Sequence, residues 1–158
     1  INYSEAHYDM VRCGIGLYGF GNSVKENANL KPIASLKSVI SQTHKIEPNE
    51  TVGYNRVYKA KGYEKTATIP IGHADGITRV YGNGKGFVFI NGKKAPIIGN
   101  VCMDMIMVNV THIDCKEGDE VVIFNSDNPA SDFAKSANTI SYEILTAISQ
   151  RVKREFLK

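Results

Sequence analysis

The sequence contains no tryptophan and only three cysteines, Cys13, Cys102 and Cys115. The cysteines are widely spaced and form no CxxC or CxxH pattern, so neither a disulfide framework nor a zinc site is indicated. Reduced thiols are typical of a cytoplasmic protein, and this is the location that we expect. The sequence also lacks a signal peptide and any apolar run long enough to cross a membrane, so we expect no membrane partner.

Positively charged residues only slightly outnumber negatively charged ones. Lys and Arg number 19 against 16 Asp and Glu, which gives a net charge of +3. The main basic cluster is the end of the chain, residues 151–158 (RVKREFLK), which we interpret as the solvated end of a helix, where positive charge matches the helix dipole. Proteins that bind single-stranded nucleic acid place aromatic side chains along a basic groove, and the absence of tryptophan argues against such a groove. We expect no nucleic-acid partner.

The remaining composition is that of a globular domain. Apolar residues make up 42% and charged residues 22% of the 158 positions, which suits one domain with a real core, or one domain with a piece of another. The sequence starts at Ile1 rather than methionine, and we expect it to be part of a longer polypeptide.

Short apolar segments separated by turn residues predict a mainly β domain. The Asn91-Gly92 pair is a strong signal for a type I′ hairpin turn. About seven strands at this spacing predict a closed or nearly closed barrel. The predicted strands cover residues 34–46, 52–58, 65–71, 86–90, 95–98, 101–110 and 120–124.

The two ends of the chain differ from the barrel pattern. Residues 11–18 (VRCGIGLY) form an apolar run bounded by glycines, which predicts a buried strand, and residues 19–29 read as a linker. Residues 129–137 (PASDFAKSA) predict a short helix. A terminal helix with Asn138 or Thr139 as N-cap is predicted by apolar residues at helical spacing, namely Ile140, Ile144, Leu145, Ile148 and Val152.

The segment PIGHADGITR (residues 70–79) places His73 two residues before Asp75. Such a pair could bind a metal, act as acid and base, or simply form a polar turn. A metal needs a third protein ligand, and the other histidines occur in no ligand spacing, so we expect no metal. Asp75-Gly76 is itself a turn dipeptide, which favours the polar turn.

Two charged residues lie in apolar surroundings. If residues 101–110 form a strand, Asp104 lies in an apolar row, where an ionised carboxylate is costly unless it is paired. Arg12, in the predicted strand 11–18, needs an acceptor for the same reason. Taken alone, Tyr54 in VGYNRVY is typical of a packed tyrosine with its hydroxyl in water.

The order of the motifs is more specific than any single motif. VRCGIGLYG, VGYNRVY, IPIGHADGITR, APIIGNVCMDM and TISYEIL follow one another without large gaps from Arg12 to the end of the chain. This series resembles the C-terminal part of alanine racemases, a pyridoxal-phosphate-dependent family with an N-terminal (β/α)8 barrel and a C-terminal β-domain. The resemblance assigns residues 1–20 to the last strand region of the barrel, 21–30 to a linker and 31–158 to the C-terminal β-barrel-like domain with its closing helix.

The resemblance implies roles for the residues that match the motifs. Tyr54 matches the catalytic tyrosine, and the backbone of Met103 matches a contact to the substrate carboxylate. The cofactor contacts implied are Arg12 at the pyridine nitrogen, the amides of Gly14 and Ile15 near the phosphate, and the Tyr142 side chain at that phosphate.

Four further residues match the substrate entrance or its support. Arg79 matches an arginine of the entrance corridor, and Asp104 is expected to support the loop of Met103. His73 and Asn100 stand where relatives usually carry a tyrosine and often an arginine. We expect His73 to have a tuning role at the entrance, since histidine can change charge near neutral pH.

The chemistry implied by the resemblance explains these residue types. Racemisation removes the α-proton from one face of the amino acid and returns one on the other, using the cofactor lysine and a tyrosine as the two bases. A free tyrosine has a pKa of about 10, so it needs cationic donors nearby to act near neutrality. Arg12 stays protonated and cannot give its proton to the cofactor ring, which limits side reactions such as transamination.

Besides His73 and Asn100, the sequence departs from the family in a larger respect, because nothing in it matches the motif of the cofactor lysine. In the family dimer the tyrosine serves the cofactor of the partner subunit. We therefore expect a homodimer with shared active sites in the full-length enzyme, which supplies D-alanine for peptidoglycan, and an inactive isolated chain.

Four alternatives stay open at this point. One is a racemase that prefers serine, and another is a racemase fused to a murein-precursor ligase. A third is a non-catalytic β-barrel that binds an oligonucleotide or a protein, and the fourth is a racemase-like domain without activity. The presence of Tyr54, Arg12 and Met103 argues against the fourth.

Overall fold

The computed structural model describes residues 3–157, and its central element is one antiparallel sheet of seven strands. The strand order is β1-β9-β6-β7-β8-β5-β2, and a separate short hairpin pairs β3 with β4. The strands are β1 (Leu36–Val39), β2 (Gln42–Ile46), β3 (Thr51–Val52), β4 (Tyr58–Lys59), β5 (Glu64–Ile69), β6 (Phe87–Ile90), β7 (Lys93–Ile98), β8 (Ile106–Asn109) and β9 (Glu120–Phe124).

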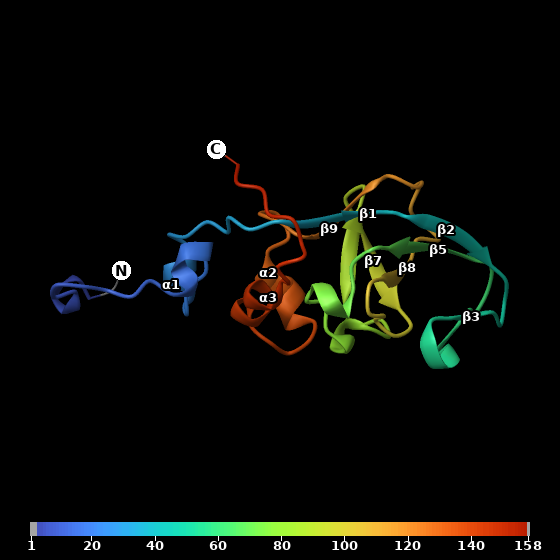
Figure 1. Cartoon of the computed structure of the whole chain (residues 1–158), viewed down its shortest axis with the longest axis horizontal. Helices are drawn as coiled ribbons and strands as arrows, with labels where there is room; N and C mark the ends of the chain where they lie inside the picture. Colours follow the sequence, from blue (N-terminus) through green and yellow to red (C-terminus); the bar gives the residue numbers. More distant parts are fainter. Residues whose placement is uncertain (1–2, 158) are drawn as a thin grey trace.

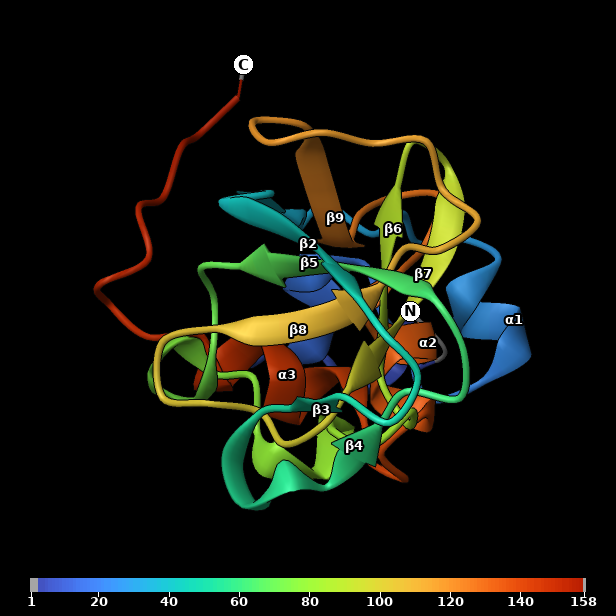
Figure 2. The ribbon, with the colours of Figure 1, turned by 90° about the vertical axis from the view of Figure 1, so that its right-hand side faces the viewer.

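The sheet curves into a barrel-like body, as Figure 2 shows. Its two edge strands, β1 and β2, are joined by only two residues, Ile40 and Ser41. The Ile40 N–H donates to the Asp119 carbonyl (2.9 Å) and the Ser41 N–H to the Thr68 carbonyl (2.9 Å). One extended segment thus pairs with both sides of the sheet and leaves few edge groups unpaired. The predicted mainly β, barrel-like fold is confirmed.

The core follows from alternation along the strands. In β6, Val88 and Ile90 are fully buried, while Phe87 and Phe89, which alternate with them, are partly exposed. This period of two is the one expected for strands with one face on a core. The turn after β6 has positive φ at both Asn91 (50°) and Gly92 (73°), which confirms the predicted type I′ hairpin.

Two helices pack together beside the barrel, α2 (Ala130–Lys135) and α3 (Ser141–Ala147), as Figure 1 shows. Phe133 of α2 stacks on Tyr81, with ring centroids 4.1 Å apart. The predicted short helix at residues 129–137 is confirmed. No helix among the residues that the structure describes is long and apolar enough to cross a membrane.

The terminal helix is shorter than predicted. It ends at Ala147 because Ile148 adopts an extended backbone (φ −61°, ψ 115°), so the prediction that it reaches Val152 is wrong. Its N-cap residue is Ile140, and the prediction of Asn138 or Thr139 is wrong as well, although the Thr139 hydroxyl contacts the Glu143 carboxylate. The basic tail is therefore not the end of a helix, and its first arginine is free to pair elsewhere.

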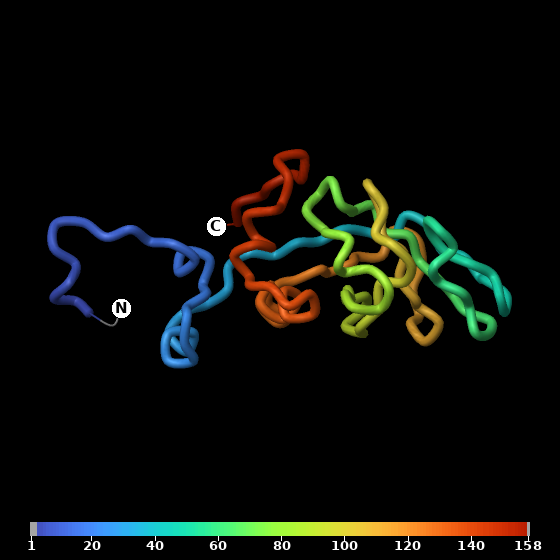
Figure 3. Tube along the Cα trace, turned by 90° about the horizontal axis from the view of Figure 1, so that it is seen from below, coloured from blue at the N-terminus to red at the C-terminus, as the bar shows by residue number. Residues whose placement is uncertain are grey.

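The segment before the barrel forms an arm that extends away from it, seen in blue in Figures 1 and 3. The predicted buried strand at residues 11–18 is wrong, because the segment is exposed and contains only a 3-10 turn (Ile15–Tyr18). A strand needs a neighbour for its backbone groups, and no described strand pairs with this segment. The predicted linker contains a short helix, α1 (Val24–Asn27), with Ser23 as N-cap.

Two predicted strands are interrupted by loops. The strand predicted at residues 52–58 is wrong, because positive φ at Gly53 (78°), Asn55 (60°) and Arg56 (51°) turns the chain sharply between β3 and β4. The strand predicted at residues 101–110 begins only at Ile106. Both loops lie at the same end of the barrel, where the site described below is built.

Candidate functional site

Tyr54 lies on a tight turn between β3 and β4. The turn holds two non-glycine residues in the left-handed region, Asn55 and Arg56, and such backbone clusters at functional sites. The Asn100 side-chain amide donates to the Tyr54 carbonyl (3.1 Å), and the Asn83 amide donates to the Asn100 side-chain oxygen (3.2 Å). Asn100 therefore fixes the backbone of the tyrosine turn.

The two tyrosines of this motif differ in their environment. Tyr54 is 66% exposed, and its hydroxyl makes no hydrogen bond with the described residues. Tyr58, four residues later, donates to the Glu64 carboxylate (2.5 Å), and burial together with this acceptor raises the pKa of Tyr58. A phenol with a raised pKa is a poor base near neutrality. Tyr54 is therefore the residue of the pair that is available to a substrate.

A second loop pair lies beside the tyrosine turn. The N–H groups of His73 and Ala74 donate to the carbonyls of Cys102 and Met103, both at 2.9 Å. Gly72 is required here, since an added Cβ would lie 2.6 Å from the Cys102 oxygen and 2.7 Å from the Met103 oxygen. No hydrogen bond within the described residues uses the Met103 N–H, so this amide is a free donor in an exposed loop.

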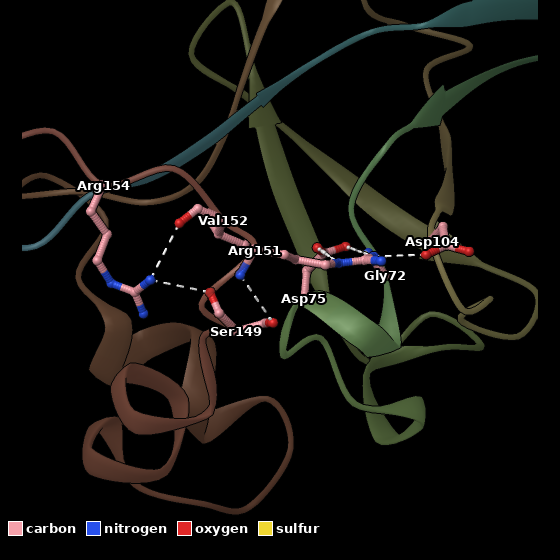
Figure 4. Close-up of polar contacts among 7 residues, drawn as sticks. All are labelled: Gly72, Asp75, Asp104, Ser149, Arg151, Val152 and Arg154. Carbon is pink, nitrogen blue, oxygen red and sulfur yellow. Dashed lines mark hydrogen bonds and ion pairs between the residues drawn. The ribbon is translucent and has the colours of Figure 1, made fainter.

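The histidine–aspartate motif is organised by an arginine from the tail, as Figure 4 shows. Arg151 Nε lies 2.6 Å from Asp75 Oδ1, and the Arg151 Nη2 lies 3.0 Å from Asp75 Oδ2. The same nitrogen lies 2.7 Å from Asp104 Oδ1. Asp75 Oδ2 also accepts from the Gly72 N–H (2.8 Å). Asp75-Gly76 forms a turn, with Gly76 at φ +109°, and His73 makes no pair with Asp75.

The environments of the two aspartates are unlike. The Asp75 side chain is only 10% exposed, and the Arg151 guanidinium holds the pKa of that carboxyl below its ordinary value, although burial opposes this. The prediction that Asp104 lies in a buried apolar row is wrong: its side chain is 59% exposed, because it lies in a loop before β8.

His73 and Arg79 are both exposed at this end of the barrel. Burial raises the pKa of the nearby Cys102 thiol, and the positive charge of Arg79 opposes that rise, which places Arg79 close to the Cys102 loop. Between residues 3 and 157 no group of three or more His, Cys, Asp or Glu side chains could hold a metal ion.

The other predicted site residues lie elsewhere. Arg12, Gly14 and Ile15 belong to the arm, which precedes α1, whereas the turn between β3 and β4 is at the far end of the long axis (Figure 1). Tyr142 is half exposed on α3. The structure thus brings together the loops of Tyr54, His73, Asn100 and Met103, and it separates them from the arm.

Sequence reasoning missed Arg151 and Asn83. The unpaired acid at Asp104 was a signal that a cation was needed, but Arg151 is 47 residues away in the chain. Asn83 carried no signal in the sequence, because its role depends on where the Asn100 side chain lies.

The sequence of this chain matches one known protein family over most of its length. A model of the family described as "Alanine racemase, C-terminal domain" matches residues 33–156. The chain is 45% identical over 162 residues to the alanine racemase of Clostridium perfringens (strain SM101 / Type A), covering 98% of this chain and 42% of that protein.

Solved structures agree with this match. The alanine racemase of D-cycloserine-producing Streptomyces lavendulae superposes with a TM-score of 0.89 at 32% identity, covering 98% of this chain and 42% of that one. The alanine racemase of Bartonella henselae with covalently bound pyridoxal phosphate superposes with a TM-score of 0.84 at 35% identity, covering 94% and 42%.

The chain spans about 42% of the length of the Clostridium perfringens relative. The matched region is the part that carries the loops around Tyr54 and Met103. The chain therefore belongs to the alanine racemase family, in which it corresponds to the C-terminal domain.

Proposed function

We propose that this chain supplies the tyrosine base and the substrate-carboxylate contact of an enzyme that interconverts L- and D-alanine. The observation that carries the proposal is that neighbouring loops present two unused groups, the exposed Tyr54 hydroxyl and the Met103 amide. Hydrogen bonds of Asn100 and His73 hold these loops together. The chemistry needs a group that carries a proton and a hydrogen-bond donor for the substrate carboxylate, held in fixed relative positions, and these loops offer both.

The cofactor of the proposed enzyme is pyridoxal phosphate, the group bound covalently in the B. henselae relative. The arm offers donors of the types that this group needs. The Arg12 guanidinium has no partner among the described residues, and neither the Gly14 nor the Ile15 N–H makes a hydrogen bond within the described chain. An added Cβ at Gly14 would meet nothing within 4 Å, so the backbone is open to close approach.

These donors fit the acceptors of the cofactor. In the proposed assembly the arm amides and the Tyr142 hydroxyl bind the phosphate oxygens, and Arg12 donates to the pyridine nitrogen. When bound, pyridoxal phosphate acidifies the α-hydrogen of the attached amino acid. Because Arg12 stays protonated, it does not transfer its proton to the ring.

The residues of this chain then have separate tasks. The Met103 N–H binds the substrate carboxylate and so orients the α-carbon. The Tyr54 hydroxyl holds and moves the proton at one face of that carbon, and a base outside this chain acts at the other face. Arg79 and His73 line the approach, and Asp104 holds the Met103 loop through Arg151.

The separation of the arm from the tyrosine turn favours a shared site. Apart from Tyr142 on α3, the residues proposed to bind the cofactor lie on the arm, and the proposed proton carrier lies at the far end of the barrel (Figure 3). A homodimer in which one subunit's arm region meets the other's loops joins the two sets. The cytoplasmic location and the supply of D-alanine for peptidoglycan are further parts of this proposal.

The direct test uses a polypeptide that joins this sequence to the remaining part of its relatives' length. We expect that protein to racemise alanine in both directions and to lose activity on removal of pyridoxal phosphate. Tyr54→Phe should lower kcat by roughly 100-fold or more, because a general base is removed. Tyr58→Phe is the matched control, and its effect should be small. Unchanged rates for Tyr54→Phe in both directions would refute the proposed role.

A further inference from the structure

The tail after α3 is held against the two loops that carry His73 and Met103. The Ser149 N–H donates to the Asp75 carbonyl (3.2 Å). At Gly76 an added Cβ would lie 2.6 Å from the Ala147 oxygen, so the end of α3 packs directly on the turn. Arg151 follows two residues after Ser149 and reaches the loops from this fixed backbone (Figure 4).

Arg151 joins two acids that belong to different loops. It contacts both oxygens of Asp75 in a bidentate pair and also reaches Asp104, next to Met103. These three side chains are called the Arg151 bridge below. Between residues 3 and 157 no other basic side chain forms an ion pair with either acid. The planar fork of arginine suits this geometry, whereas a lysine is a point donor that cannot reproduce it.

The bridge acts on backbone that the proposed substrate contact depends on. Asp75 caps the turn through the Gly72 N–H (2.8 Å), and that turn donates from His73 and Ala74 to the carbonyls of Cys102 and Met103. Asp104 directly follows Met103, so its pair with Arg151 restrains the same loop at a second point. The Met103 amide therefore lies between two restraints that share Arg151.

We propose that Arg151 is a positioning residue that sets the Met103 amide and the His73 turn for substrate binding. The proposal rests on the proposed racemase function for its kinetic consequence. Its structural consequence, a slower opening of the two loops, holds whatever reaction the enzyme catalyses. Arg151 itself touches no reacting atom, so its loss affects the binding of substrate more than the chemical step.

The test compares four single variants of the full-length protein with wild type. Arg151→Met removes the bridge, and Arg151→Lys keeps the charge without the fork. Asp104→Asn weakens the contact between Arg151 and residue 104 and leaves the buried Asp75 paired with Arg151. Lys153→Met is the control, since Lys153 is a basic residue of the same tail whose ion-pair partner is the exposed Glu155.

The first readout is amide hydrogen exchange followed by mass spectrometry, with peptides that cover residues 72–76 and 101–105. We expect Arg151→Met to speed exchange there roughly tenfold, because local opening becomes easier. Arg151→Lys and Asp104→Asn should give smaller increases. Lys153→Met should exchange like wild type.

The second readout is steady-state kinetics with L-alanine. Arg151→Met should raise KM roughly tenfold while kcat changes about threefold or less, and Arg151→Lys should recover part of the loss. If Arg151→Met fails to fold, Arg151→Lys and Asp104→Asn decide the matter. Exchange and KM equal to those of Lys153→Met would overturn the proposal.

The two proposals fail in different ways. A wild-type protein that does not racemise alanine refutes the proposed function, while the exchange data still test the bridge. An active wild type whose loops and KM do not respond to Arg151→Lys or Asp104→Asn refutes the bridge alone.

Discussion

The arm and the barrel-end loops differ in how the chain itself restrains them. In the loops, backbone groups of distant segments bond directly, and Gly72 has no room for a Cβ. In residues 3–18 no side chain is buried, and Gly14 has open space around it. The hydrogen bonds and packing that hold the loops thus come from this chain itself, whereas the arm has hydrogen-bond donors that the described residues leave unused. One chain therefore completes only one half of the proposed site.

The largest effect on stability is expected from a glycine exchange that compares the two regions. Gly72→Ala places a Cβ 2.6 Å from the Cys102 oxygen and 2.6 Å from the Met105 nitrogen. Both are backbone atoms, and shifting them costs free energy. Overpacking of this kind should lower the free energy of unfolding by roughly 2 kcal/mol or more. Urea denaturation followed by circular dichroism measures it.

Gly14→Ala is the matched exchange on the arm. Because nothing lies within 4 Å of the added carbon, the free energy of unfolding should stay within about 0.5 kcal/mol of wild type. Equal urea midpoints for the two variants would show that the loops are not confined as described.

A smaller effect is expected when Arg151 is replaced and the stability of the protein is measured at acid pH. The Arg151 guanidinium lowers the pKa of the Asp75 carboxyl. A carboxyl whose folded pKa is lowered contributes stability above its unfolded pKa of about 3.9 and loses it as the pH falls through the folded value. Arg151→Met should therefore raise the pH midpoint of acid unfolding, by roughly half a pH unit for one linked group.

The control for the acid measurement is again Lys153→Met. Its ion pair with Glu155 is exposed on both sides, so the acid midpoint should match wild type. Tyrosine fluorescence or circular dichroism follows the transition. If the two variants unfold at the same pH, Asp75 is not stabilised by Arg151.

Much of the barrel could be predicted because its signals are local. Asn91-Gly92 encodes its turn by the two positive φ angles that these residues tolerate, and the buried residues of β6 encode its face by alternation. The breaks in the predicted strands were not readable in this way. Asn55 and Arg56 adopt positive φ inside a run that reads as a strand, and only the surrounding loops hold them there.

The candidate site was predictable in its residues and not in its connections. The motif order pointed to Tyr54 and Met103, which the fold places on neighbouring loops. The partner of Asp75 lies 76 residues away, and a basic residue in a charged tail gives no sign of it. The buried strand predicted at residues 11–18 is absent, because an apolar run predicts burial without saying which surface provides it.

The most direct test of a shared site mixes two slow variants of the full-length protein. Tyr54→Phe is defective in the loops, and Arg12→Glu is defective on the arm. A hybrid dimer keeps one site with an intact arm from one subunit and an intact tyrosine from the other. After subunit exchange we predict alanine racemisation at roughly a quarter of the wild-type rate, because half of the dimers are hybrids with one working site each. A mixture that stays as slow as its two parents, although hybrids are shown to form, would contradict the account.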